Sequence, residues 1–420
     1  MKDNFFIGAA TAAHQVEGNN TNSDYWLQEQ LPHSAFAEPS GIACDHYRRY
    51  AEDIALMQKA GLNAYRFSIE WARIEPEEGV FDGAEIEHYR DVIHCCKAHG
   101  IEPMVTLHHF TSPVWLIRKG GWEDASVVEY FRRYAVYVIK ALGAELHYVC
   151  TINEANMGLQ VAAIERRYRM MAEQAARLDS NVQVGINLTQ MMENQRQLAA
   201  ENAEVFGTPN PQVFVSSRTP EGDKLVMRAH EAARDAIKAT YPQIQVGLTL
   251  SLHDIQALPG GEDAAAAAWD DEFLHYQPAI VNDDFLGVQN YSRMRYGPDG
   301  LVPPPESAKL TQMDYEDYPA ALENVLRRVQ KDFPRTLIVT ENGIATDDDT
   351  RRVEFIREAL AGVSRCKADG LPVEGYLYWS LLDNFEWQKG YAMQFGLVAV
   401  DRETLERKPK ESLWQLRASC

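Results

Sequence analysis

Residues 337–343, LIVTENG, predict a buried strand that ends in a carboxylate. Four β-favouring residues lead directly into Glu341, and Asn342 and Gly343 then end the strand. An unbroken apolar run that is bounded by a turn signal is typical of a strand buried on both faces. A carboxylate at the end of such a strand either marks its exit into solvent or belongs to a site. This stretch alone does not decide between the two.

Residues 148–154, YVCTINE, repeat the design, because β-favouring residues again lead to a glutamate, Glu154. Two carboxylates at the ends of buried strands far apart in sequence can face each other only if the strands share a sheet or a barrel. Glycoside hydrolysis requires such a pair. One carboxyl group protonates the leaving oxygen, while the other attacks the anomeric carbon or positions water there.

Short strand candidates alternate with amphipathic helices along the whole chain. The eight strands are expected at residues 5–12, 64–68, 102–107, 148–153, 245–251, 285–289, 337–340 and 373–379. This alternation, without a break in composition, predicts an α/β fold that is a single (β/α)8 TIM barrel over residues 1–420. A doubly wound open sheet is the alternative. It is disfavoured because no glycine-rich phosphate loop follows the first strand.

The helices expected beside these strands cover residues 45–60, 84–99, 126–142, 225–240, 318–333, 351–368 and the C-terminal ESLWQLRA. A bare barrel needs about 250 residues, so a chain of 420 residues carries extended βα loops. We expect the surplus in a helical excursion over 155–223, with helical runs at 164–178 and 192–205, and in the loops 252–284 and 293–317.

Composition limits the classes of partner and the cellular compartments that are expected for this chain. Apolar residues make up 45% of the chain, which suits a sizeable core, and the net charge of −20 disfavours nucleic acid and anionic membranes as partners. The N-terminal residues fit a first strand and not a signal peptide, and no run reaches the length of a membrane helix. The six cysteines lack metal-binding spacing, which predicts free thiols and a cytoplasmic location.

Polar and aromatic residues gather where the predicted strands end. They are Gln15, Arg66, His109, Asn153, Glu154, Asn290, Tyr291, Glu341, Trp379, Glu386 and Trp387. Hydroxyl-reading groups, an aromatic platform and two acids together match a sugar, which is a neutral polyol with an apolar face. Neither a metal nor a cofactor is predicted. The adjacent His108 and His109 would point to opposite sides of an extended segment, which makes them poor joint ligands.

At this point the chain resembles glycoside hydrolase family 1, of the β-glucosidase type. The resemblance covers residues 5 to about 401 and rests, in order, on HQVEG, YRFSIEW, TLHHFTSPVWL, TINEA, GVQNYS, VTENG and WSLLDNFEW. It implies a retaining exo-β-glycosidase that hydrolyses terminal β-D-glucosyl residues of oligosaccharides and β-glucosides. Any one of these tetrapeptides is a weak signal, whereas the ordered series is highly specific.

The resemblance also implies roles for single residues. Glu154 would be the general acid/base and Glu341 the nucleophile, with Arg66 and Tyr291 holding and tuning Glu341. Asn153 would bind the sugar 2-hydroxyl. Trp379 would stack under the ring, and the remaining hydroxyls would be bound by Gln15, His109, Glu386 and Trp387. At the separation that a retaining mechanism needs, the anionic nucleophile keeps the second carboxyl group protonated.

Three departures from the family pattern concern the substrate. Phe110 stands where the family usually has Trp, Ala155 where it has Pro, and Asn290 precedes Tyr291 where it has Tyr. They leave the finer sugar and leaving-group preference open. A β-galactosidase or β-fucosidase, a 6-phospho-β-glycosidase, and a non-catalytic glycan-binding barrel are therefore kept as alternatives. The phosphorylated substrate is disfavoured because Glu386 would repel it.

Overall fold

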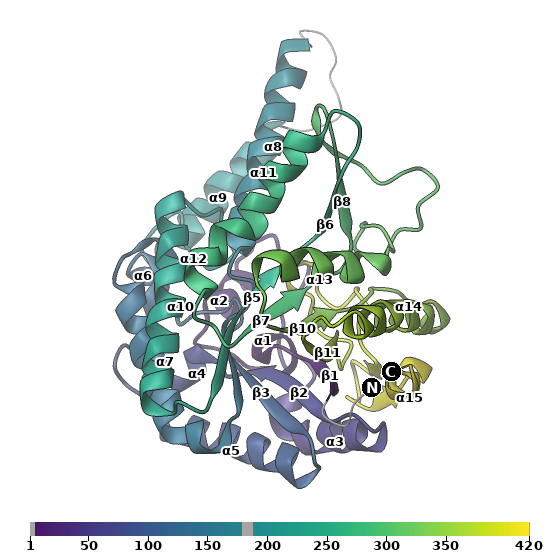
Figure 1. Cartoon of the computed structure of the whole chain (residues 1–420). Helices are drawn as coiled ribbons and strands as arrows, with labels where there is room; N and C mark the ends of the chain where they lie inside the picture. Colours follow the sequence, from purple (N-terminus) through teal and green to yellow (C-terminus); the bar gives the residue numbers. More distant parts are fainter. Residues whose placement is uncertain (1–4, 179–187, 420) are drawn as a thin grey trace.

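The barrel is closed by eight parallel strands in the order β1-β11-β10-β7-β5-β4-β3-β2 (Figure 1). The computed structural model describes residues 5–178 and 188–419, with side chains described outside 168–192. The strands are β1 (Phe6–Ala10), β2 (Ala64–Ser68), β3 (Glu102–His108), β4 (Tyr148–Ile152), β5 (Gln245–Ser251), β7 (Phe285–Gln289), β10 (Thr336–Asn342) and β11 (Val373–Trp379). All eight predicted strands and the (β/α)8 fold are confirmed.

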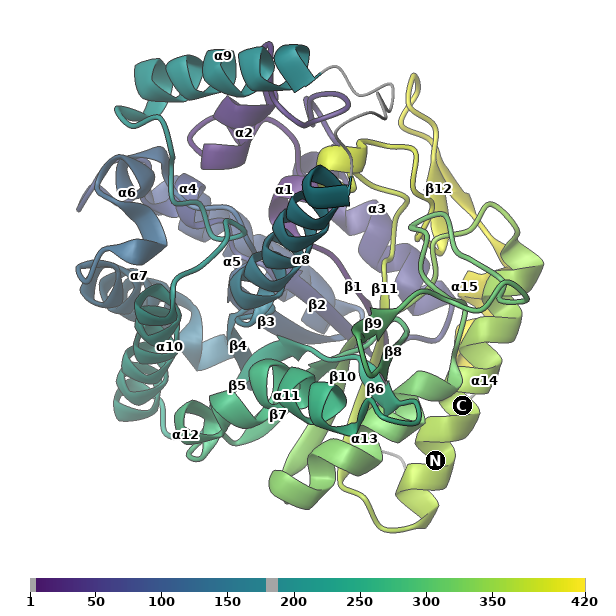
Figure 2. The same ribbon diagram turned by 90° about the horizontal axis from the view of Figure 1, so that it is seen from above.

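A ring of helices surrounds the barrel when it is seen from above (Figure 2). The longer ones are α3 (His46–Lys59), α5 (Gly83–Ala98), α7 (Val127–Leu142), α10 (Pro220–Thr240), α13 (Ala320–Asp332) and α14 (Asp349–Ala368). Capping residues start α10 and α14 earlier than the expected positions 225 and 351. The Asp348 carboxylate caps α14 by accepting from two backbone N–H groups, and Thr219 caps α10 one residue before a proline.

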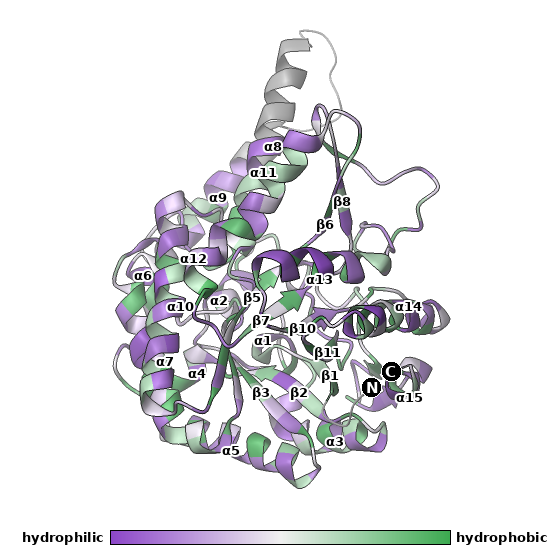
Figure 3. Cartoon of the chain, in the orientation of Figure 1, coloured by the Kyte–Doolittle hydropathy of each residue, from purple (hydrophilic) through white to green (hydrophobic). Residues whose placement is uncertain are grey.

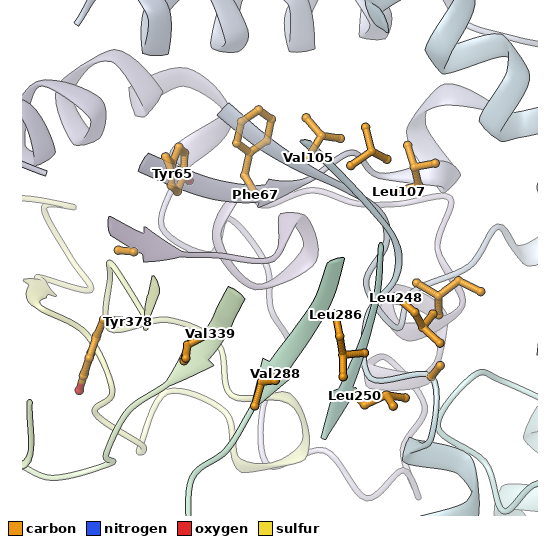
Figure 4. Packing of buried hydrophobic residues seen from close by; sticks show 14 of the residues in the cluster. Tyr65, Phe67, Val105, Leu107, Leu248, Leu250, Leu286, Val288, Val339 and Tyr378 are labelled. Carbon is orange, nitrogen blue, oxygen red and sulfur yellow. The ribbon is translucent and has the colours of Figure 1, made fainter. Parts of the chain in front are cut away.

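The core has two layers, because successive residues of a strand point to opposite faces. Figure 4 shows side chains such as Phe67, Leu107 and Leu250 directed away from the ring of strands, towards the helices. A second cluster fills the inside of the barrel and includes Met104, Cys150, Phe285, Ile338 and Leu377. In Figure 3 the strands β5 and β7 are mainly hydrophobic in colour, whereas α13 beside them is mainly hydrophilic.

The surplus residues lie above the carboxyl ends of the strands, where α8 (Met157–Leu178) rises beside β6 (Asp254–Ala257) and β8 (Arg293–Gly297) (Figure 1). The helical run predicted at 164–178 starts earlier, since the backbone oxygen of Asn156 accepts the first helical N–H groups. The second run is confirmed as α9 (Leu188–Phe206). Among the described residues, no helix is long and apolar enough to cross a membrane.

Two expected loops contain regular structure. Residues 252–284 hold β6, α11 (Glu262–Glu272), η3 (Leu274–Tyr276) and α12 (Gln277–Ile280), and 293–317 hold β8 and β9 (Gly300–Val302). β6, β8 and β9 form a small sheet of their own, so the pairing of distant segments made strands that short, polar sequences did not predict. β1 is also shorter than predicted, because the chain turns into α1 (Ala13–Val16), whose first N–H donates to Ser68 Oγ.

The shorter elements complete the loops and the C-terminal region. They are α2 (Asp24–Glu29), α4 (Trp71–Ile74), α6 (Val114–Arg118), η1 (Gly121–Glu123), η2 (Gly143–Glu145), η4 (Trp387–Lys389), β12 (Val398–Val400), β13 (Arg407–Pro409) and α15 (Glu411–Ala418). Trp71 and Trp122 are buried and pack in the main hydrophobic cluster, so they have a structural role and do not line the cavity.

Gly8→Ala should lower the free energy of unfolding by about 1–3 kcal/mol, the usual effect of overpacking a core. A Cβ on Gly8 would collide with the backbone carbonyl oxygen of Ala64 on the neighbouring strand, which cannot move without breaking the ladder. Gly83→Ala is the matched control, since no atom lies within 4 Å of a Cβ at the start of α5. Urea denaturation would measure both, and equal stability of the two variants would contradict the packing argument.

Candidate active site

A bulge in β10 turns Glu341 into the barrel. The pairing register of β10 shifts between Val339 and Glu341 against β7, and by Asn342 against β11. Thr340 already faces the interior, because its hydroxyl lies against the space beside Gly287. Strict alternation would point the next side chain outwards, and the bulge instead brings Glu341 inwards as well. The irregular pairing of β10 thus directs the Glu341 carboxylate into the barrel.

Arg66 and Tyr291 hold the Glu341 carboxylate from two sides. Arg66 Nη1 donates to Oε1 at 2.6 Å, and the Tyr291 hydroxyl donates to Oε2 at 2.6 Å. Arg66 is fully buried, and its Nη2 donates to Asn153 Oδ1 at 2.6 Å. Burial raises the pKa of Tyr291 well above its usual range, so the phenol keeps the proton that it donates. These contacts bring together four of the predicted site residues.

Glu154 follows β4 in a left-handed conformation with φ of 43°. Its backbone N–H donates to Thr249 Oγ1 at 3.0 Å, and the next N–H, of Ala155, donates to the carbonyl oxygen of Thr249 at 3.1 Å. Two bonds to β5 therefore hold the chain in a conformation that non-glycine residues seldom adopt. Phe110 and Trp387, which also line the cavity, have φ angles of 69° and 48°.

Burial and neighbouring charges affect the pKa values of Glu154 and Glu341 differently. Burial, then the charge of Glu341, raise the pKa of Glu154 well above its usual range. Burial also raises the pKa of Glu341, but the Arg66 guanidinium and the Tyr291 hydrogen bond act in the opposite direction. Glu341 is therefore the group that ionises first, and its charge together with burial favours the protonated form of Glu154. That is the division of acid and nucleophile that a retaining glycosidase needs.

A polar cluster from the two ends of the chain lies at the other side of the cavity. Gln15 Nε2 donates to Glu386 Oε2 at 3.3 Å and to the backbone oxygen of Phe385 at 2.8 Å. Burial and the charge of Glu341 raise the pKa of Glu386 to about 8. Gln15 Oε1 and His109 Nδ1 are buried and without a hydrogen-bond partner among the described residues. Such atoms are ready to receive hydroxyl groups.

Aromatic rings form the remaining wall. The His109 ring stacks with Trp379, with ring centroids 5.5 Å apart, and with Trp387 at 6.1 Å. His108 points away, and contacts Trp122 and Ser112 instead, as expected for neighbours in an extended segment.

Among the residues that the structure describes, no group of three or more His, Cys, Asp or Glu side chains is arranged to hold a metal ion.

The cavity has a volume of about 820 Å³. Seven of the ten predicted site residues line it, namely His109, Glu154, Tyr291, Glu341, Trp379, Glu386 and Trp387. Arg66, Asn153 and Gln15 are not among the lining residues and contact those that are. The structure therefore gathers all ten at one site.

Sequence reasoning missed the residues that support this site. Gln289 Nε2 donates to Asn153 Oδ1 at 2.8 Å, and Thr106 Oγ1 accepts from Arg66 Nε at 2.9 Å. Asn290, which was expected at the strand mouth, instead donates to two backbone oxygens. Ser251 hydrogen-bonds Glu154 and lines the cavity. Their signal was weak: Thr106, Ser251 and Gln289 are single polar residues at inward positions of otherwise apolar strands.

Glu341→Gln should lower the pKa of Glu154, because it removes the negative charge that disfavours ionisation of the second carboxyl group. A carbon-13 NMR titration of labelled glutamate side chains would measure the shift. Glu386→Gln is the control and should lower the pKa of Glu154 less, because the charge of Glu386 is the smaller of the two influences. An unchanged Glu154 pKa in Glu341→Gln would show that the two carboxyl groups do not interact.

Comparison with known proteins agrees with this geometry. The model of glycosyl hydrolase family 1 matches residues 1–170 and 273–417. The thermostable β-glucosidase B of Thermobispora bispora is 32% identical over 98% of this chain and 89% of its own, and the β-glucosidase A of Acetivibrio thermocellus is 30% identical over 97% and 95%. A crystal structure of a β-glycosidase has a TM-score of 0.89, with 44% identity over 100% of this chain and 97% of that one. The chain belongs to glycosyl hydrolase family 1.

Proposed function

We propose that this enzyme hydrolyses terminal, non-reducing β-D-glucosyl residues of short oligosaccharides and β-glucosides with retention of configuration. The observation that carries the proposal is the asymmetry of two buried carboxyl groups in one cavity. Glu341 is clamped by a cation and a phenol, whereas Glu154 has a raised pKa and no cation in hydrogen-bond contact among the described residues. Relatives named as β-glucosidases support glucose as the sugar.

In the first step, a Glu341 oxygen attacks the anomeric carbon while the bond from that carbon to the leaving oxygen breaks. Glu154 transfers its proton to the leaving oxygen, so the aglycone departs as a neutral alcohol. The negative charge of Glu341 is consumed in the new ester bond. The main electrostatic reason for the raised pKa of Glu154 then disappears, and the group becomes a carboxylate.

In the second step, Glu154 accepts a proton from water as the water oxygen attacks the anomeric carbon. The bond to Glu341 breaks and its carboxylate returns to Arg66 and Tyr291. Two inversions at one carbon give net retention. An acceptor alcohol in place of water would give transglycosylation by the same chemistry.

The sugar is proposed to lie between the aromatic wall and the Gln15–Glu386 pair. Trp379 would pack under the ring, and Asn153 would bind the 2-hydroxyl group. The free buried acceptor of Gln15 and the free ring nitrogen of His109 match two further hydroxyl groups. The pKa of Glu386 is about 8. Its carboxyl group can therefore donate a hydrogen bond to a sugar hydroxyl group when it is protonated and only accept hydrogen bonds when it is ionised.

Two rivals within the family follow from the same site. Galactosides and fucosides differ at hydroxyl groups that Glu386 can also bind. A 6-phosphoglycoside would place its phosphate in the field of the Glu341 charge, which disfavours it. Because burial and Glu341 raise the pKa of Glu386 to about 8, Glu386 itself repels a phosphate less than the sequence suggested. A barrel that binds glycans without cleaving them is the rival of another class, and it has no need for the clamp around Glu341.

Two wider parts of the proposal concern the whole protein. We propose that residues 1–420 form one catalytic domain and that its partner is a small sugar substrate, with no nucleic acid and no membrane. A cytoplasmic location is a further prediction, supported by Cys44, Cys95, Cys96, Cys150 and Cys366, which are free thiols.

A panel of p-nitrophenyl glycosides tests the proposal. The β-glucoside should have the highest kcat/KM, with β-glucose as the first product by NMR, ahead of the β-galactoside, β-fucoside, α-glucoside and 6-phospho-β-glucoside. A higher kcat/KM for the phosphorylated glucoside would overturn the role of Glu386. Binding of glucosides without turnover of any member would support the non-catalytic barrel.

Glu341→Ala should lower kcat by about 10⁴-fold or more, as expected when a nucleophile is removed. Added azide should then restore turnover of an activated aryl glucoside and yield the α-glucosyl azide, because a single inversion replaces two. Glu154→Ala is the paired variant, and it should slow poor leaving groups far more than p-nitrophenolate. A β-configured azide product from Glu341→Ala would refute its assignment as nucleophile.

A further inference from the structure

The cavity continues past the catalytic pair, between α8 and the β8–β9 hairpin. α8 begins at Met157, three residues after Glu154, and its Met157, Val161 and Arg167 line the cavity beyond this carboxyl group. Figure 2 shows α8 crossing above the barrel, with β8 and β9 to one side of it. In the described cavity, this outer part is lined by side chains of a different kind from the hydroxyl-binding groups at the Gln15–Glu386 end.

The outer wall carries a group of apolar side chains beside its polar residues Gln160 and Ser292. Its side chains include Met157, Val161, Met294, Leu301 and Val302. A subsite for a second sugar would be expected to present hydrogen-bonding groups, because each hydroxyl group buried without a partner is unfavourable. Aliphatic and thioether side chains instead favour a flat or chain-like apolar group, and methionines adapt to aromatic rings. The outer part therefore fits an apolar aglycone better than a sugar.

The cavity carries positive charge that the fold does not neutralise, with two cations on the elements of the outer wall and a third on η4, next to Glu386. Arg167 on α8, Arg295 on β8 and Lys389 on η4 line the cavity. Arg295 Nη2 donates to the backbone oxygen of Pro303 at 2.7 Å. None of the three has a carboxylate of the described residues within ion-pair distance.

The neighbouring charges do not cancel this excess. Arg293 is paired with both oxygens of Glu316, each at 2.8 Å, and its guanidinium lies over the ring of Tyr318. Asp314 is the remaining acid of the outer wall. The outer wall thus has more unpaired cations than acids, in a chain whose net charge is −20. A local excess of cations against such a background favours an anionic group on the ligand.

We propose that this outer region is an aglycone subsite for aryl β-glucosides whose ring carries a carboxylate. The aromatic ring would lie against Met157 and Met294, and the carboxylate would meet Arg295, with Arg167 and Lys389 adding to the positive field. Arginine suits this role because its planar fork donates two parallel hydrogen bonds to a carboxylate. The inference rests on the proposed β-glucosidase function and specifies the leaving group of that reaction.

The test compares 4-carboxyphenyl and 4-carbamoylphenyl β-glucosides, which have nearly the same shape and differ in charge. In the unaltered enzyme the carboxylate should have the higher kcat/KM after both values are normalised to the electronic effect of each substituent on non-enzymatic hydrolysis. Arg295→Gln should lower the ratio of the two kcat/KM values by about 5-fold, the scale of one partly exposed ion pair. Raising the salt concentration should lower the ratio in the unaltered enzyme and less so in Arg295→Gln.

Arg48→Gln is the matched control, because Arg48 lies on α3, is 72% exposed and is not part of the cavity wall. It should leave the ratio unchanged. Arg167→Gln and Lys389→Gln provide two further variants on separate elements, in case Arg295→Gln affects the hairpin itself. An unchanged ratio in all three cavity variants would overturn the inference while p-nitrophenyl β-glucoside hydrolysis still supports the β-glucosidase function. Loss of that hydrolysis in the unaltered enzyme would instead overturn both.

Discussion

The buried guanidinium of Arg66 is the charge on which the rest of the site depends. Its three nitrogens donate to Thr106, Glu341 and Asn153, which come from three other strands or strand ends of the barrel. A guanidinium cannot escape burial by losing its proton, so an anion must accompany it in the folded protein. Glu341 is that anion. The pairing therefore favours the ionised form of Glu341, the proposed nucleophile, and ties together the carboxyl ends of β2, β3, β4 and β10.

Three carboxyl groups share the field of this pair, and their surroundings give them different tasks. Burial raises the pKa of all three, but only Glu341 contacts the cation, which acts in the opposite direction, whereas Glu154 and Glu386 are buried without one. Three like charges in one desolvated cavity would repel one another strongly. The site resolves this by keeping one group ionised and leaving the others protonated or close to their titration point. The different protonation states of the three carboxyl groups follow from their burial and from the charge of Arg66.

Much of this arrangement was readable from the sequence. LIVTENG and YVCTINE predicted two buried strands ending in carboxylates, and the alternation of strands and helices predicted the closed barrel. The bulge that aims Glu341 was not predictable, because pairing with two neighbours creates it. Thr249 and Ser251 lie outside the two segments that the family model matches. Their support of Glu154 becomes visible only in the structure, where the end of β4 lies beside β5. The small sheet of β6, β8 and β9 likewise depends on pairing between segments far apart.

The hydrogen bonds from Gln15 to Phe385 and Glu386 join the first and the last parts of the barrel. β1 pairs with β11, so the sugar-reading end of the cavity exists only where the ring of strands meets itself. A chain growing from its N-terminus would hold Glu154 early in synthesis yet could not form this pair until the residues around Glu386 had emerged. This end of the cavity is consequently complete only when the whole ring is closed, so its integrity reports on that closure and not on the stability of any single strand.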